Sequence, residues 1–239
     1  MHSSTRAAPG GLHNDLLDAL PRQERDRLLQ GARRQSMEIR NVLFESNQTL
    51  ESVHFPLSGM ISLVTPMQDG MFVEMGTVGR EGIVGVPMVL DSRRTANAQA
   101  VSQVAGESLV VPAEVFRREF DRGGRLSELT HSFVQALFSL VGQNAACNRL
   151  HTMQQRCARW LLMTHDRVGA DEFHLTHEFL SQMLGSRRAS VTEAAAGLKQ
   201  AGAISYHRGN LRILDRRALE AEACECYPVI RGVFDALYE

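Results

Sequence analysis

The chain has 239 residues, of which 26 are lysine or arginine and 27 are aspartate or glutamate, so its formal net charge is -1. This length suits one large domain or two smaller ones, and 44% hydrophobic with 22% charged residues is typical of a soluble globular protein. The composition excludes disordered and fibrous proteins. The near-zero charge argues against a nucleic-acid-binding protein, which usually carries a basic surplus.

The N-terminus and the cysteines indicate a reducing compartment. Residues 1–11 lack the apolar stretch of a secretory signal, and no run approaches the 18 apolar residues of a membrane span. We therefore expect a cytoplasmic protein with no membrane partner. The four cysteines, Cys147, Cys157, Cys224 and Cys226, contain no CxxC pair and match neither a disulfide framework nor a zinc ribbon.

The first half of the chain contains short segments of β character bounded by glycine, proline, asparagine or aspartate. They cover residues 42–44, 53–55, 60–64, 71–75, 98–104 and 108–111. Short strands at this spacing predict an antiparallel roll of the jelly-roll kind. With the helices that follow, the predicted fold class is α+β.

After the Gly123-Gly124 break, one face of a helix of about 25 residues is marked by apolar residues spaced three and four apart. The face contains Leu126, Leu129, Phe133, Leu137, Leu140, Asn144 and Cys147. A stripe this narrow is typical of a coiled-coil seam, so we expect its first six residues to form a homodimer interface, with Asn144 fixing the register. The alternative is a helix packed against its own β-roll.

The second half predicts a winged helix-turn-helix. After a helix over residues 152–167, residues 176–184 and 187–200 form two short helices, with Thr176 and Ser186 as N-caps and Gly185 between them. Residues 204–207 and 211–214 alternate around Arg208 as a β-hairpin. Two short helices joined by a glycine turn and followed by a hairpin make this motif.

The start of the second helix of this motif has the residue types that bind DNA. Arginine reads guanine in the major groove, and serine and backbone amides hold phosphates. The expected contacts are Ser186, Arg187, Arg188, Ser190, Thr192, Glu193 and, in the hairpin, Arg208. Residues 185–217 hold seven positive and two negative charges, a net charge of +5, which leaves -6 for the remainder. The neutral total therefore conceals a basic module, and the alternative is a helix-turn-helix used for protein contacts.

Three motifs together resemble the Crp/Fnr family of bacterial transcription regulators. They are Phe55-Pro56-Leu57-Ser58-Gly59, residues 155–162 (QRCARWLL), and Leu175-Thr176 with residues 184–191 (LGSRRASV). The resemblance implies a cyclic-nucleotide-binding-type β-roll, a dimerisation helix and a winged helix-turn-helix. It also implies a homodimer on palindromic double-stranded DNA, with RNA polymerase as a further partner.

The resemblance assigns roles by position in the recognition helix. The turn glycine corresponds to Gly185, the base-reading arginine to Arg188, and the phosphate contacts to Arg187 and Ser190. The family often has Glu after that arginine and another Arg four residues later, whereas this chain has Ala189 and Glu193. We therefore expect DNA binding, at a site that differs from the best-known family half-site.

The resemblance places an effector site in the β-roll, at Gly85, Arg94 and Thr95. The Glu that accepts the ribose hydroxyl in cyclic-AMP receptors is missing, because Val86 follows Gly85 and Glu81 lies too far upstream. A cyclic nucleotide is therefore not the favoured effector. An iron–sulfur cluster of the Fnr kind is not expected, because no cysteine precedes Cys147.

The domain boundaries follow from these breaks. We expect a flexible N-terminus over 1–12, a β-roll over 13–122, a dimerisation helix over 123–150, a winged helix-turn-helix over 151–214 and a helical extension over 215–239, interrupted at Pro228. Cys224 and Cys226 point to different sides of such a helix, so core packing is their favoured role and a thiol switch the alternative.

No enzyme is indicated, because no nucleophile, base and orienting group can be assembled from the residues. No metal site is expected either, because His174 and His177 flank a helix start with no second histidine at position 181. The predicted function is a sequence-specific DNA-binding transcription regulator. The rival is a ligand-sensing or scaffold protein whose helix-turn-helix contacts another protein.

Overall fold

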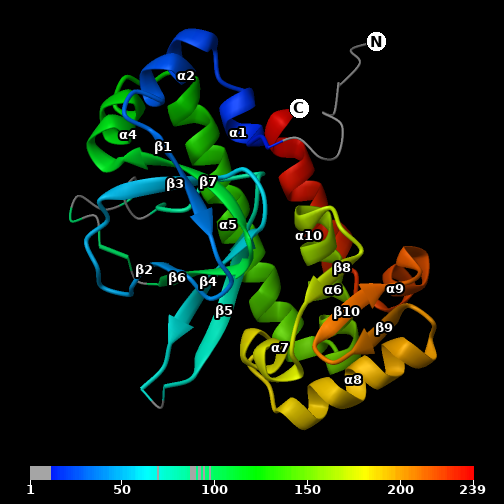
Figure 1. The fold of residues 1–239 in the computed structure, drawn as a ribbon. Coiled ribbons are helices and arrows are strands. Elements are labelled where there is room, and N and C mark those ends of the chain that lie inside the picture. The colour runs from blue at the N-terminus through cyan, green and yellow to red at the C-terminus, as the bar shows by residue number, and fades with distance from the viewer. Residues whose placement is uncertain (1–11, 69, 87–89, 91–92, 94, 97) are drawn as a thin grey trace, which may run out of the picture.

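The computed structural model describes residues 12–68, 70–86, 90, 93, 95, 96 and 98–239. Figure 1 shows a β-roll, the long helix α5 (Arg125–Leu150) and a C-terminal domain of helices with a small sheet. This order of parts and the α+β class confirm the fold predicted from the sequence. None of the helices among the described residues is long and apolar enough to span a membrane.

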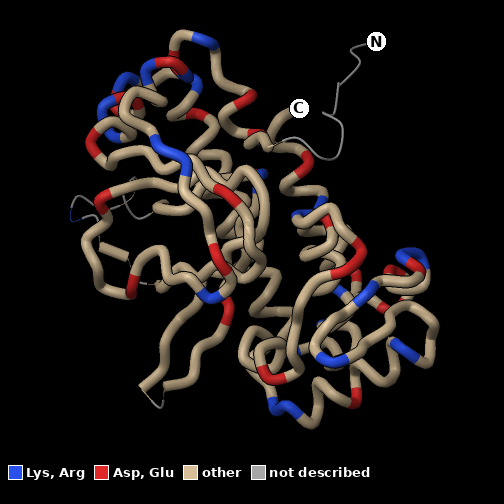
Figure 2. Tube along the Cα trace, in the orientation of Figure 1, with Lys and Arg blue, Asp and Glu red and all other residues tan. Residues whose placement is uncertain are grey.

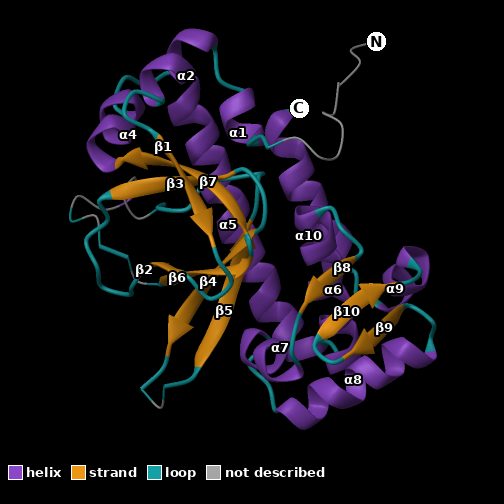
Figure 3. Cartoon of the chain, viewed as in Figure 1, coloured by secondary structure: helices purple, strands orange, loops and turns teal. Residues whose placement is uncertain are grey.

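Two antiparallel sheets make the β-roll (Figure 3). One has the order β1 (Arg33–Met37), β7 (Gly106–Pro112), β3 (Ser52–Pro56). The other has the order β2 (Val42–Phe44), β6 (Gln99–Val104), β4 (Met60–Pro66), β5 (Phe72–Val78). Each predicted strand is present. The edge strand β1 was not predicted, because its sequence RRQSM buries only Met37 and carries no apolar alternation.

Short helices close the ends of the β-roll. Helices α1 (Asp15–Asp18) and α2 (Arg22–Leu28) precede it, and α4 (Ala113–Phe120) follows β7. The buried Asn14 fixes the first of them, because its side chain accepts from Leu17 N and donates to Pro56 O and Gly82 O. The chain then breaks at Gly123, whose φ is 72°, and enters α5.

The face of α5 that the sequence predicts as a dimer seam packs along the β-roll of the same chain. Its residues Leu126, Leu129, Phe133, Leu137 and Leu140 are between 0% and 9% exposed within the single chain. Asn144 donates to Met75 O at 2.8 Å and accepts from Arg159 Nη1 at 2.6 Å. These six side chains are therefore occupied inside the chain, as the alternative interpretation expected, and a seam needs another face of α5.

The C-terminal domain begins one residue after α5. Helix α6 (Met153–Val168) starts with a capping box between Thr152 and Gln155 and ends at Gly169 in the left-handed conformation. Helices α7 (His177–Met183) and α8 (Arg188–Gln200) follow, then β9 (Ile204–His207) and β10 (Asn210–Ile213). Strand β8 (Glu172–His174) pairs with β10 and completes a sheet of order β8-β10-β9.

The C-terminal extension consists of α9 (Arg216–Glu222), α10 (Cys226–Asp235) and the 3-10 turn Ala236–Tyr238. Helix α10 packs on α5 and α6. The predicted interruption at Pro228 is wrong, because the helix breaks at residues 223–225 instead. Pro228 lies in the first turn of α10, where its missing N–H has no helical partner to lose.

Gly82→Ala tests the close approach of α5 to the β-roll. A Cβ at Gly82 would lie 2.0 Å from Phe133 Cε2, so the buried ring must shift. We expect a loss of about 1–3 kcal/mol in the free energy of unfolding, measured by denaturant titration. The control is Gly232→Ala in α10, where a Cβ meets nothing within 4 Å and the gain in helix propensity should stabilise the protein. Equal stability of the two variants would contradict the packing argument.

Candidate DNA-binding interface

The two helices of the motif are held by one polar cap and one glycine. Thr176 Oγ1 accepts from Phe179 N at 3.1 Å and starts α7. Gly185 follows α7 with a φ of 56°, a conformation that favours glycine. Helix α8 buries Val191, Ala194, Ala195 and Leu198 against the rest of the domain. The opposite face of α8 is therefore left to solvent.

That outer face carries the residues predicted to contact DNA. Arg187, Arg188, Thr192 and Glu193 are exposed, and Ser190 is half-buried. Ser186 is not the N-cap that the sequence predicted: Arg187 takes that position, and no side chain caps α8. No side chain therefore caps the first backbone N–H groups of α8. The positive end of the helix dipole lies beside Arg187 and Arg188.

His177 is part of this surface, although the sequence placed it only at a helix start. Its Nδ1 lies 3.1 Å from Thr192 Oγ1, and its ring stacks on Tyr206 with centroids 4.4 Å apart. Tyr206 in turn donates to Leu175 O at 2.8 Å. Burial, and then the charge of Arg188, lower the pKa of His177, which favours the neutral ring beside the arginine. His177 thereby holds the recognition helix against the sheet.

The hairpin between β9 and β10 has a two-residue turn. His207 pairs with Asn210, and Arg208 and Gly209 between them have φ values of 48° and 85°, as a type I′ turn requires. Arg208 is exposed at the tip. Figure 2 shows lysine and arginine at both ends of α8 and on this hairpin, all within the C-terminal domain. The turn therefore presents a positive charge beside the recognition helix.

A cavity of about 290 Å³ lies between the β-roll and α5, where the resemblance placed an effector. Its described lining is entirely apolar or glycine and includes Leu63, Met75, Gly85, Val134 and Phe138. Of the residues predicted to bind an effector, Gly85 belongs to this described lining. Thr95 is held elsewhere, where its hydroxyl donates to Arg93 O at 3.3 Å, and Arg94 lies outside the described residues.

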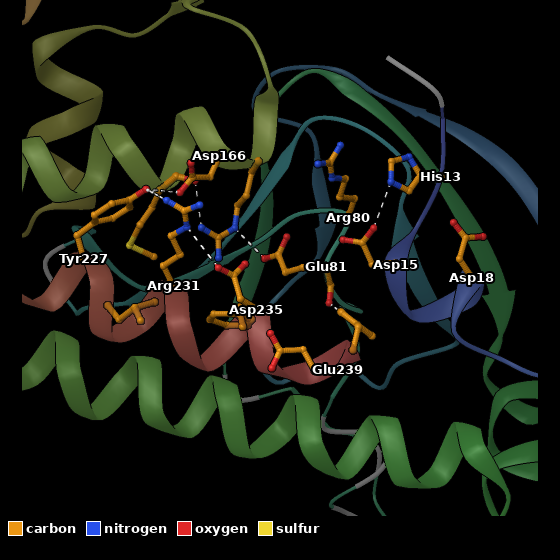
Figure 4. Close-up of a pocket in the computed structure, with 15 residues that line it drawn as sticks. His13, Asp15, Asp18, Arg80, Glu81, Asp166, Tyr227, Arg231, Asp235 and Glu239 are labelled. Carbon is orange, nitrogen blue, oxygen red and sulfur yellow. Dashed lines mark hydrogen bonds and ion pairs between the residues drawn. The ribbon is translucent and has the colours of Figure 1, made fainter. Parts of the chain in front are cut away.

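Glu81, the other carboxylate considered for the effector, faces a different cavity. This second cavity, of about 550 Å³, lies between α1, α6 and α10 and is lined by many charged groups (Figure 4). Its charges are largely paired within the chain. Arg167 Nε donates to Glu81 Oε1 at 2.8 Å, and Tyr227 donates to Asp166 Oδ2 at 2.8 Å. The first bond ties α6 to the β-roll and occupies Glu81 away from the first cavity, and the second ties α10 of the extension to α6.

Two family models match this chain, one on each side of α5. The cyclic nucleotide-binding domain matches residues 34–122, and the Crp-like helix-turn-helix domain matches residues 155–222. A search of curated proteins gives no match.

Solved structures share the fold over most of their length. A regulator of the crp/fnr family from Eubacterium rectale has a TM-score of 0.68 at 17% identity, covering 86% of this chain and 96% of that one. FixK2 from Bradyrhizobium japonicum has a TM-score of 0.68 at 14% identity, with 81% and 98% covered. A cyclic nucleotide binding protein from Ruegeria pomeroyi has a TM-score of 0.58 at 25% identity, with 86% and 92% covered.

The two matched domains, in this order and joined by a long helix, are those of transcription regulators and not of enzymes. The chain belongs to the Crp/Fnr family of transcriptional regulators.

Proposed function

We propose that this regulator is a homodimer that binds a roughly palindromic DNA site in a sequence-specific way. The observation that carries the proposal is the uncapped N-terminus of α8, which exposes Arg187 and Arg188. A recognition helix enters the major groove by this end, where an arginine pairs with guanine O6 and N7. The place of action of such a protein is the bacterial cytoplasm.

The neighbouring groups suit the phosphate backbone. Backbone N–H groups at a helix N-terminus bind phosphate readily, and Ser190 adds a hydroxyl on the same turn. Arg208 at the hairpin tip supplies a further positive charge to an adjacent phosphate. In this proposal Arg188 reads a base, whereas Arg187, Ser190 and Arg208 fix the position of the domain.

The free face of α5 supports a dimer. Val134, Phe138, Val141 and Ala145 step by three and four along it, and Phe138 is 75% exposed. Spacing of this kind forms a coiled-coil seam, and a two-fold axis would bury the stripe against its own copy. We assign the dimer interface to this face in place of the one that the sequence suggested.

The apolar cavity supports an effector other than a cyclic nucleotide. A cyclic phosphate and its ribose need charged and hydrogen-bonding partners, and the described lining offers none from its side chains. A small apolar molecule fits this lining. Val134, Phe138 and Val141 belong both to the cavity and to the proposed seam, so such a molecule would act directly on the pairing of the two helices.

Arg188→Ala should reduce the affinity for the cognate site by about 1–3 kcal/mol and leave non-specific binding almost unchanged, because a base contact is lost. The cognate site comes from selection of bound DNA followed by sequencing, and affinity from fluorescence anisotropy. Arg34→Ala on β1 removes the same charge far from α8 and serves as the control. An equal loss on all sequences would instead make Arg188 a phosphate contact.

A salt titration of the same complex separates DNA binding from the rival function as a protein-binding scaffold. Each protein charge that neutralises a phosphate releases a counterion and steepens the fall of log K with log salt concentration. Arg208→Ala should therefore reduce the magnitude of this slope by about one. Binding of genomic fragments without a steep negative slope would favour the scaffold.

Phe138→Glu should convert the dimer to a monomer in sedimentation or light-scattering experiments. The carboxylates of the two copies would lie together in an apolar seam, which costs far more than the lost contact. Ser132→Glu places the same charge on another exposed face of α5 and should leave the dimer intact. A dimeric Phe138→Glu variant would place the interface elsewhere.

Cyclic AMP and cyclic GMP at millimolar concentration should change neither the Tm nor the affinity for DNA, because the described lining lacks polar side chains. An apolar fluorescent dye should bind, and Leu63→Trp should displace it by filling the cavity. A dose-dependent rise of Tm with either nucleotide would contradict this effector class.

A further inference from the structure

Three thiols and one imidazole meet where α5 ends and α10 begins. The ligand atoms of Cys147, His151, Cys224 and Cys226 all lie within 4.8 Å of one another. The three cysteines are buried, and His151 is half-buried. Cys147 lies in the last turn of α5, His151 follows that helix, and Cys224 and Cys226 come from the extension. Residues 77 positions apart in the chain are thus brought to one point.

The prediction that Cys224 and Cys226 point to different sides of the extension is wrong. It assumed that Cys224 and Cys226 stand on one continuous helix. Cys224 instead lies in the break at residues 223–225, and Cys226 is the first residue of α10. The bend turns both sulfur atoms toward the end of α5.

Two distances in the cluster match the edges of a tetrahedron around one ion, and all four ligand atoms lie close enough to reach the same ion. With Zn–S bonds of about 2.3 Å and Zn–N bonds of about 2.0 Å, tetrahedral edges are about 3.8 Å between two sulfurs and about 3.5 Å between sulfur and nitrogen. Cys147 Sγ lies 3.6 Å from Cys224 Sγ, and Cys226 Sγ lies 3.5 Å from His151 Nδ1. In an iron–sulfur cluster the four ligands are distributed over two or four irons, so ligand atoms on different irons would lie farther apart than the 4.8 Å that encloses this cluster.

Side chains around the cluster form hydrogen bonds with the His151 ring and with Cys226 Sγ. His151 Nε2 lies 3.1 Å from Glu225 Oε1, which favours the tautomer with hydrogen on Nε2 and leaves the Nδ1 lone pair toward the sulfurs. This is the carboxylate–histidine arrangement of metal sites. Gln143 Nε2 also donates to Cys226 Sγ at 3.0 Å, a bond that stabilises a thiolate.

The burial of these cysteines differs from that of an ordinary core thiol. Cys157 is buried within the main hydrophobic core of the chain. Within the described part of the chain, Cys147, Cys224 and Cys226 form a buried cluster separate from that core. Packing against apolar neighbours therefore accounts for Cys157 and not for the group of three.

We propose that Cys147, Cys224, Cys226 and His151 bind one Zn²⁺ ion in tetrahedral coordination. Three thiolates and an imidazole form a closed structural site, and soft thiolate ligands select zinc over magnesium or calcium. Binding releases the thiol protons to solvent, so affinity falls at acidic pH. The ion ties the extension to the end of α5 and has no open coordination position for chemistry.

The test uses the full chain without a polyhistidine tag, purified under reducing conditions. Elemental analysis should find about one zinc per chain. After chelation, titration with Co²⁺ should give the intense visible bands of a tetrahedral site and thiolate charge-transfer bands, and Zn²⁺ should abolish both. Absence of metal together with absence of these bands in the folded apoprotein would overturn the proposal.

Matched variants locate the site. Cys226→Ala should lose the cobalt bands, whereas Cys157→Ala removes a buried thiol elsewhere and should retain one equivalent of metal. Glu225→Gln on the exposed surface should fold normally and bind zinc about 10–100-fold more weakly, measured against a chromophoric chelator. Retention of full affinity in both Cys226→Ala and Glu225→Gln would overturn the proposal. A Cys147–Cys224 disulfide in the protein isolated from cells would do so too, in favour of a thiol switch.

Discussion

The close approach of α5 to the β-roll fixes the rest of the arrangement. At two positions along its path an added side chain would force a neighbour to shift: a Cβ at Gly76 would lie 2.7 Å from Leu140 Cδ2, and one at Gly82 would lie 2.0 Å from Phe133 Cε2. Burial of each large apolar side chain on this face stabilises the fold by about 1.5–3 kcal/mol. The helix cannot rotate about its axis without losing these contacts. The β-roll therefore determines that the face carrying Phe138 remains exposed.

A buried polar network carries this constraint into the C-terminal domain. Trp160 Nε1 on α6 donates to Glu74 Oε1 on β5 at 2.9 Å, and Arg159 on α6 reaches Asn144 on α5. Burial raises the pKa of Glu74 above its usual range, even though donors surround its carboxylate. A raised pKa means that the folded state binds this proton more tightly than the unfolded state. The free energy of unfolding therefore falls as pH rises and Glu74 loses its proton. The ionised Glu74 carboxylate thus lowers the stability of the fold that its network connects.

Local sequence patterns predicted the helices and strands. They failed for features that depend on a segment distant in the sequence. Glycine-bounded apolar runs predicted the strands of the roll, and Thr176 with Gly185 predicted the helix-turn-helix. The spacing along α5 correctly grouped Phe133 with its neighbours on one face, but periodicity does not say which surface covers that face. Strand β1 pairs at an edge and needs no apolar alternation. The role of Cys224 depended on a helix break that the apparent continuity of the extension concealed.

The hinge between α5 and α6 is a single extended residue, so the linker itself cannot hold the DNA-binding domain. His151 separates Leu150 at the end of α5 from the N-cap Thr152, with φ -105° and ψ 151°. The orientation of α8 must therefore come from contacts across the hinge. They include the Asn144–Arg159 bond and the cluster in which Cys147 at the end of α5 meets Cys224 and Cys226 of the extension. Packed interfaces of this kind change between discrete arrangements and do not deform continuously. In the proposed mechanism a molecule in the apolar cavity would contact the same helix at Val134, Phe138 and Val141, about three to five turns before the hinge. A small shift of α5 there would move Asn144 and Cys147 together, and the recognition helix would follow as a rigid body.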